Sequence, residues 1–287
     1  ILYNGLYGLL PRQYIASEMF ERVDVQRGAS AFLNGMAPGG GSIGGTIALM
    51  PKRAPQEDLN RLNIGYSSSE RTNVGADISR RFGDNKEFGV RLNVAHTEGE
   101  SEIDHDNARN TMFHLGLDWK GEQARVSADL GYQKNNLSGT RPSITLSGVS
   151  SVPAAPKATS NWAQRWTYSD ERDVFGTVRA EYDFLPNLTG YAAYGFRDGK
   201  EENVLANLTV RDVNGDGTEY RFDNARRNII HTGEVGVKGS FATGAVDHGV
   251  VLAANRYQEK RKNAYVMDWQ NTFATNLYRP TYINGIS

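Results

Sequence analysis

From Arg61 onward, hydrophobic and polar residues alternate along the chain with a period of two. In residues 88–98, for example, the apolar Phe88 and Val90 fall on one side of an extended chain, and Gly89 and Arg91 fall on the other. Such a segment is a strand with one apolar and one polar face. The same alternation recurs in the runs 62–66, 74–78, 113–119, 126–132, 174–182, 188–196, 204–210, 235–241 and 247–258.

The lengths of these strands and of their connections favour a membrane barrel. Many strands extend for about ten residues, which a tilted strand needs to cross a bilayer, whereas globular strands average about five or six. Short connections (83–87, 120–123, 183–187 and 242–245) alternate with longer ones (99–109, 136–166 and 212–217), and only the first connection, at 67–71, breaks the pattern. Short turns on one rim and long loops on the other are typical of outer-membrane barrels.

The strand count predicts that this barrel is incomplete. Counting along the chain gives about nine strands, whereas a bacterial single-chain barrel has an even number and must close, because an open edge in lipid leaves backbone groups unpaired. The chain also opens on Ile1 in the middle of a pattern. We therefore expect it to be an internal piece of a longer precursor.

Composition agrees with this fold class. Only 39% of the 287 residues are hydrophobic and the mean hydropathy is -0.55, yet Gly numbers 31 and Tyr 14. A barrel with an apolar lipid face and a polar lumen has such an average. The formal net charge of -1 argues against a nucleic-acid partner, and the absence of cysteine excludes a disulfide framework.

The glycine-dense segment 21–53 precedes the alternating strands. Strand-like runs at 22–26 and 46–50 bracket it, with Gly35, Gly39, Gly40, Gly41, Gly44 and Gly45 between them. Glycine permits positive φ and close backbone approach, which a compact segment packed inside another structure needs. We therefore expect residues 1–55 to form the C-terminal part of a plug domain, and residues 56–287 to form the N-terminal part of a transmembrane antiparallel β-barrel.

At this point the chain resembles a known family, the TonB-dependent outer-membrane receptors, and siderophore receptors in particular. The motifs that carry the resemblance are Glu21 to Gly28, Phe32 to Gly35, Pro38 to Gly40, Gly44 to Ile47 and Pro51 to Arg53. Weaker matches are Asp77, Arg91 to Asn93 and Thr243 to His248.

The resemblance implies a barrel of about 22 strands around a plug, in the outer membrane of a Gram-negative bacterium. It also implies active uptake of a ferric siderophore, with TonB as the energy-coupling partner, outer-membrane lipid as the surroundings, no enzymatic activity and no cofactor. The first half of the plug, with its TonB-binding segment, is expected to be missing from this sequence. The sequence does not identify the siderophore.

Candidate site residues follow from the same resemblance. Related plugs raise a loop toward the ligand where this chain has Tyr7, Leu10, Arg12, Gln13 and Tyr14, and aromatic and cationic groups suit an anionic ferric chelate. A surface turn is the alternative interpretation. Trp162, in the long loop, is a further candidate, because this loop could close over the pocket. Trp166 of the same loop is as well explained as an aromatic-girdle residue at the membrane interface.

Arg27 corresponds to a plug arginine that pairs with glutamates of the barrel wall in this family, and it is the predicted plug-barrel lock. A solvated arginine in a strand is an equally good interpretation of this residue. A buried ion pair of this kind is weak evidence for stability. Its expected role is to hold the plug and to break when the plug is pulled.

One loop resembles the beginning of a calcium-binding loop, with Asp212, Asn214 and Asp216 in ligand positions and Asp223 in the twelfth place. Because Asn-Gly and Asp-Gly are turn formers, a plain hairpin tip is the favoured interpretation. Three alternative functions stay open: a soluble β-sandwich module that binds carbohydrate or calcium, a passive porin, and a receptor for haem, cobalamin or another metal chelate.

Overall fold

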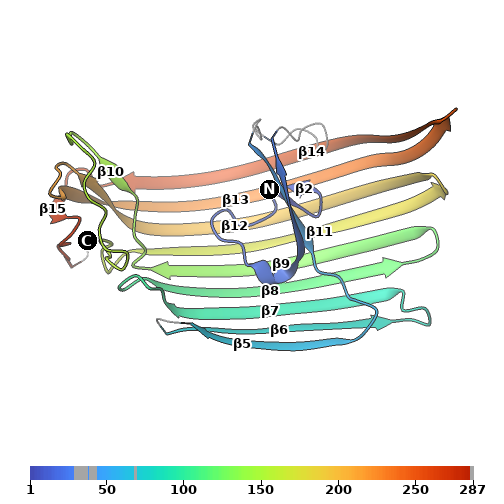
Figure 1. The fold of residues 1–287 in the computed structure, drawn as a ribbon, viewed down its shortest axis with the longest axis horizontal. Coiled ribbons are helices and arrows are strands. Elements are labelled where there is room, and N and C mark those ends of the chain that lie inside the picture. The colour runs from blue at the N-terminus through green and yellow to red at the C-terminus, as the bar shows by residue number, and fades with distance from the viewer. Residues whose placement is uncertain (29–37, 39–43, 68–69, 285–287) are drawn as a thin grey trace.

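The computed structural model describes residues 1–28, 38, 44–67 and 70–284, which form two β-sheets (Figure 1). The smaller sheet has the strand order β2-β1-β4-β3, and the larger one has the main path β14-β13-β12-β11-β9-β8-β7-β6-β5. The N-terminal segment crosses the middle of the larger, curved sheet (Figure 1). The glycine-rich residues 29–37 and 39–43 lie outside the described part.

The smaller sheet is built from short elements. They are β1 (Leu2–Tyr3), β2 (Leu6–Tyr7), the 3-10 helix η1 (Ser17–Met19), β3 (Phe20–Arg27) and β4 (Gly45–Pro51). β3 and β4 pair antiparallel and match the two predicted strand-like runs, whereas β1 runs parallel to β4 and has no alternation long enough to be predicted. Gly45 has a φ of 126°, and a Cβ there would lie 2.1 Å from the carbonyl oxygen of Gln26. This pair of strands therefore requires glycine at that position.

The larger sheet contains nine strands on its main path, in agreement with the predicted count. They are β5 (Leu59–Ser67), β6 (Arg71–Phe82), β7 (Phe88–Glu100), β8 (Asn107–Lys120), β9 (Ala124–Ser138), β11 (Tyr168–Leu185), β12 (Leu188–Val210), β13 (Asp216–Thr243) and β14 (Val246–Met267). Two short strands, β10 (Ile144–Leu146) and β15 (Phe273–Asn276), pair with β12 and β13 off this path. Consecutive long strands are antiparallel, and all four predicted short turns occur where expected.

The sequence prediction was wrong about the two longest strands. The runs 188–196 and 204–210 belong to one strand, β12, and β13 begins at Asp216 rather than near 235. In both places charged residues interrupt the apolar alternation, but their backbone stays paired with the neighbouring strand. Charge disrupts the hydrophobic pattern without disrupting the ladder, because these parts of the strands do not face hydrocarbon.

The two faces of the large sheet differ as the alternation predicted. Side chains that point to the plug are buried and mostly polar, as shown by Asn93, His114, Asp129 and Thr177. The outer face carries exposed apolar side chains, among them Leu62, Ile64, Val74, Ile78, Leu117, Val126, Leu130, Val178, Tyr194, Val235 and Val237. One continuous curved sheet with a polar inner face and an apolar outer face is part of a membrane barrel. The alternative of a two-layer sandwich is therefore wrong.

In the described part of the chain, no helix has the length and apolar character needed to span a membrane.

The plug packs on the barrel wall through an apolar cluster, the shared core. Its plug members are Tyr3, Leu6, Leu9, Leu10, Ala16, Met19 and Leu49, and its wall members are Ala95, Met112, Phe175, Ala193 and Ile230. The wall members come from β7, β8, β11, β12 and β13 and interrupt an otherwise polar inner face. Phe175 is fully buried and lies edge-on to Tyr3, with 5.6 Å between ring centroids. Burial of these side chains stabilises docking by about 1.5–3 kcal/mol for each large one.

Candidate functional site

A pocket of about 380 Å³ lies between the plug and the barrel wall. The plug side contributes Tyr7, at the end of β2, and Leu10 and Arg12, which follow this strand. Strands β13 and β14 supply Arg226 and Tyr257 from the wall, among other residues. Three of the predicted ligand residues therefore line one pocket together with side chains from the inner face of the barrel.

The charged residues of the pocket lining are mostly cations: Arg12, Arg197, Arg226 and Arg261 against the single acid Glu259. Three of these arginines have carboxylate partners. Arg12 Nε donates to Glu201 Oε1 over 2.9 Å, Arg197 Nε to Asp173 Oδ1 over 2.7 Å, and Arg261 Nη2 to Glu259 Oε1 over 3.0 Å. The hydrogen bonds to Glu201 raise the pKa of the Arg12 guanidinium, which stays charged at any physiological pH.

Arg226 differs from the other three arginines of the pocket. Its Nε donates to Asn228 Oδ1 over 3.2 Å, and among the described residues no carboxylate lies within ion-pair distance of its guanidinium. Glu201 and Glu259 act on the charge of Arg226 only from beyond ion-pair distance, so Arg226 is the arginine of this pocket best placed to receive an anionic ligand atom. Sequence reasoning missed Arg226, because the run 216–234 was not recognised as a strand with a lumen face.

The other predicted ligand residues lie outside this pocket. Gln13 and Tyr14 are exposed, and Gln133 Nε2 on the wall donates to the Tyr14 carbonyl oxygen over 2.7 Å. Trp162 is buried at the rim of the long loops, where it packs against Leu208 and Leu277 and donates to the Pro142 carbonyl oxygen over 3.0 Å. Ligand contacts by these three residues stay predictions.

Arg27 is exposed at the end of β3, where it lies opposite Gly45. Among the residues that the structure describes, no acid forms an ion pair with it, and its role as a lock stays a prediction. Lys52 and Arg53 are the cations that join the plug end to the described wall. The resemblance contained both residues, but no sequence signal marked them as partners of the barrel.

Lys52 and Arg53 each form an ion pair with the wall, and the larger of the two contacts is centred on Asp129. Both of its oxygens accept hydrogen bonds from Arg53, with Nη2 to Oδ2 at 2.6 Å. Thr177 Oγ1 donates to Oδ2 over 2.9 Å, and His114 Nε2 lies 3.3 Å from Oδ1. The side chain of Asp129 is 0% exposed, so this carboxylate is fully removed from water. A buried charge of this kind depends on its cation.

The hydroxyl of Tyr3 extends the same network, since its oxygen lies 3.1 Å from His114 Nε2. Burial raises the pKa of Tyr3 well above its usual value, so the hydroxyl stays protonated. Asn4 Nδ2 also donates to Asp129 Oδ2 over 3.3 Å. The first strand of the plug is therefore tied to the same carboxylate as Arg53.

Asp77 forms the second contact. Lys52 Nζ lies 3.1 Å from its Oδ2, and Arg91 on the neighbouring strand donates to both of its oxygens over 2.9 and 2.8 Å. Arg91 Nη1 also donates to the Arg53 carbonyl oxygen over 2.7 Å. In the sequence, Asp77 was recognisable only as an aspartate on the polar side of an alternating strand.

The calcium-loop candidate is a hairpin tip between β12 and β13. Asp212 Oδ1 accepts the backbone N–H groups of Asn214 and Asp216 over 2.9 and 3.0 Å, and Asp223 lies along β13, where it accepts from Arg221. Among the described residues no group of three or more His, Asp or Glu side chains is placed to hold a metal ion. The carboxylate of Asp212 is used by the turn itself, as the turn interpretation expects.

Comparison with known proteins agrees with the fold described above. No family model matches the chain. The ferrichrome receptor FcuA of Yersinia enterocolitica is 38% identical over 283 residues, which are 99% of this chain and 37% of the relative. The ferric preacinetobactin receptor BauA of Acinetobacter baumannii is 33% identical, with a TM-score of 0.92 over 98% of this chain and 44% of the other. The ferric-catecholate import receptor Fiu of E. coli K12 shares the fold, with a TM-score of 0.83 at 18% identity.

The curved sheet and its inserted segment define a partial outer-membrane β-barrel with part of its plug. On sequence and structure together, the chain is similar to part of outer-membrane receptors for ferric siderophores. Its place is the outer membrane of a Gram-negative bacterium. The chain spans less than half the length of these relatives.

Proposed function

We propose that the receptor to which this chain belongs takes up a ferric siderophore by TonB-dependent active transport. The observation that supports this most directly is the arginine-rich pocket between plug and wall, which suits an anionic metal chelate. The relatives are named as receptors for ferrichrome and ferric preacinetobactin, which supports the same ligand class. The names describe receptors and not enzymes.

We further propose that residues 1–55 belong to the plug and residues 56–287 to the barrel. The separation of the two sheets between β4 and β5 supports this division. In this proposal, the ligand binds on the plug side that carries Tyr7 and Arg12. A pull by TonB on the plug then breaks the Lys52 and Arg53 contacts and opens a path. Strand addition is the docking mode that suits an energised partner of this kind.

Replacement of Arg226 by glutamine is expected to weaken siderophore binding by the full-length receptor about 10- to 100-fold, because a hydrogen bond to a charged group contributes about 1.5–3 kcal/mol. The measurement is titration of the purified receptor with ferrichrome, ferric preacinetobactin and a ferric catecholate. Arg256→Gln is the matched control, since Arg256 is exposed on the outer face of the adjacent strand and lies away from the pocket. It should bind as the unmodified receptor does.

Haem and cobalamin are included in the same titration. Saturable binding of one of them, with no binding of any ferric siderophore, would contradict the proposed ligand class. Energy dependence is tested separately by uptake of radioactive iron in cells with and without TonB. Uptake that persists at the same rate without TonB would contradict active transport and favour a passive pore.

A further inference from the structure

A long loop and a later segment of the chain meet over the outer ends of β12 and β13. We call residues 139–167 the long loop, and residues 273–283, which include β15, the end segment. Both pack with the two strands in one apolar cluster, which consists of Trp162, Leu208, Val210 and Leu277. Figure 1 shows β10 and β15 at the same end of the large sheet.

A carboxyl group lies buried at this cluster. Glu219 is paired with Leu208 across the β12–β13 ladder, so both side chains lie on the same face of the sheet. Glu219 is 0% exposed, and its Oε2 accepts a hydrogen bond from Gln164 Nε2 over 2.8 Å. Its Oε1 has no hydrogen-bond partner among the described residues. A charge at this position would have neither water nor a full set of hydrogen bonds.

The charged groups of the surrounding elements bind other partners or face water. Arg141 and Arg165 of the long loop stack over Trp162 and Tyr282, at 5.0 and 5.2 Å from the ring centroids. On β13, Arg221 pairs with Asp223 over 3.0 Å. Asp212 binds backbone N–H groups of the hairpin tip, and the remaining charged groups are exposed: Lys157, Arg211, Asp216 and Arg279. Among the described residues, no cation forms an ion pair with Glu219.

Glu219 lies outside the lipid. It is the fourth residue of β13, which has 28 residues and ends at a short turn. A strand needs only about 9–11 residues to cross the bilayer, and short turns are periplasmic, so Glu219 is on the extracellular side. Burial raises the pKa of its carboxyl group from 4.5 to about 7, and the hydrogen bond from Gln164 opposes this shift. The group therefore gains or loses its proton near neutral pH.

Gln164 joins Glu219 to the end segment. Its Nε2 also donates to the Thr281 carbonyl oxygen over 2.8 Å, and its Oε1 accepts a hydrogen bond from the Ile283 backbone N–H over 3.0 Å. Gln164 is itself 0% exposed. One amide group thus connects the long loop, β13 and the end segment. We call Gln164 and Glu219 the latch.

We propose that the latch is a pH-sensitive closure of the extracellular rim. While Glu219 is protonated, the latch holds the long loop and the end segment on the ends of β12 and β13. When Glu219 is ionised, both segments are released, because water must then reach the carboxylate. The latch does not depend on a ligand, and only its effect on ligand entry rests on the proposed function.

The direction of the pH effect follows from proton binding. Between pH 4.5 and about pH 7, the packed segments keep a proton on Glu219 that the released segments have lost. The stability of the packed arrangement therefore falls as the pH rises through this window and is constant above it.

The test is hydrogen exchange of the purified full-length receptor in detergent, without ligand, measured by mass spectrometry at about pH 5 and about pH 8. The rates are divided by those of the same peptides in the unfolded chain, which removes the intrinsic effect of pH. Peptides that cover residues 160–167 and 277–283 should lose protection about 30- to 100-fold at the higher pH. Peptides that cover residues 188–196, within the lipid band, should not change.

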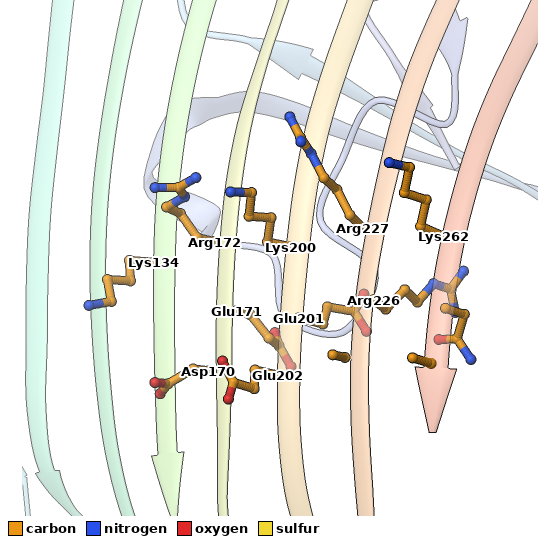
Figure 2. Close-up of a pocket in the computed structure, with 13 residues that line it drawn as sticks. Lys134, Asp170, Glu171, Arg172, Lys200, Glu201, Glu202, Arg226, Arg227 and Lys262 are labelled. Carbon is orange, nitrogen blue, oxygen red and sulfur yellow. The ribbon is translucent and has the colours of Figure 1, made fainter. Parts of the chain in front are cut away.

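Glu219→Gln keeps the size of the side chain and removes the charge, so both segments should stay protected at both pH values. Glu202→Gln is the matched control, because it makes the same chemical change at an exposed carboxylate of β12, opposite Asp170 in the ladder (Figure 2). It should keep the pH dependence of the unmodified receptor. Heat-modifiable migration on gels confirms that each variant is folded before it is measured.

His105 is a second titratable group at the long loop, with its Nε2 at 3.3 Å from Arg165 Nη2. Its protonation would repel Arg165 and loosen the loop at acidic pH, which is the opposite direction. His105→Asn, which suits the φ of 61° at this position, should therefore leave the loss of protection at the higher pH in place. Protection that falls toward acidic pH, or a pH dependence that persists in Glu219→Gln, would overturn the proposal. Equal protection of the unmodified receptor at both pH values would overturn it as well.

Discussion

Replacement of Asp129 by asparagine in the full-length receptor is expected to lower the free energy that holds the plug in the barrel by about 3–5 kcal/mol, because removal of one partner of a buried ion pair leaves the other charge buried and uncompensated. Asparagine keeps the size of the side chain, so the substitution tests charge rather than packing. Arg53 then loses its ion-pair partner among the described residues, and the contacts from Asn4 and His114 lose strength as well.

Hydrogen exchange measured by mass spectrometry reports this change directly. Peptides that cover β1 and β4 should exchange faster in the Asp129→Asn variant, while peptides from β8 and β9 keep their protection. Asp183→Asn is the matched control: Asp183 pairs with Arg125 over 2.6 Å on the barrel wall near a short turn. Its effect on the plug peptides should be negligible. Unchanged exchange of β1 and β4 in Asp129→Asn would show that this carboxylate does not hold the plug.

Replacement of Phe175 by alanine is the second large expected effect. It should lower the free energy that holds the plug in the barrel by about 3–5 kcal/mol. Phe175 belongs to the barrel wall, but it is 0% exposed, because its ring covers Gly131 on the next strand and meets Tyr3 of the plug. Its removal leaves a cavity in the shared core between the two parts. The plug should therefore dissociate at a lower urea concentration, as measured by protease sensitivity of residues in β1 and β4.

Phe196→Ala provides the matched control. Phe196 also lies over a glycine of the neighbouring strand, Gly176, but on the outer face of the sheet. The two variants lose the same side chain from opposite faces. Equal protease sensitivity of the plug in both variants would mean that Phe175 acts on the barrel as a whole and not on docking.

Much of the fold could be predicted from the sequence. Alternation of apolar and polar residues in runs such as 88–98 and 126–132 located strands, because a membrane wall imposes opposite demands on its two faces. The long strands beyond the lipid band were harder to recognise. There the outer face no longer meets hydrocarbon, and charged residues in the segment 197–202 interrupt the apolar alternation although its backbone is paired throughout.

The candidate site could be predicted only in part. Tyr7, Leu10 and Arg12 were identified from one local segment and do line one pocket. Arg226 and Asp129 became evident only in the structure, since their importance depends on plug residues far away in the sequence, such as Arg53, which is 76 residues from Asp129. Alternation shows which face a residue occupies, but the register of the plug against the wall is a tertiary property.

The shared core has a consequence for biogenesis. Seven of its buried side chains come from the plug and five from the wall, so neither part can complete a hydrophobic interior by itself. Before the barrel strands assemble around the plug, its seven apolar side chains are exposed to water and to other chains. Docking of the plug and assembly of these five wall strands therefore stabilise each other.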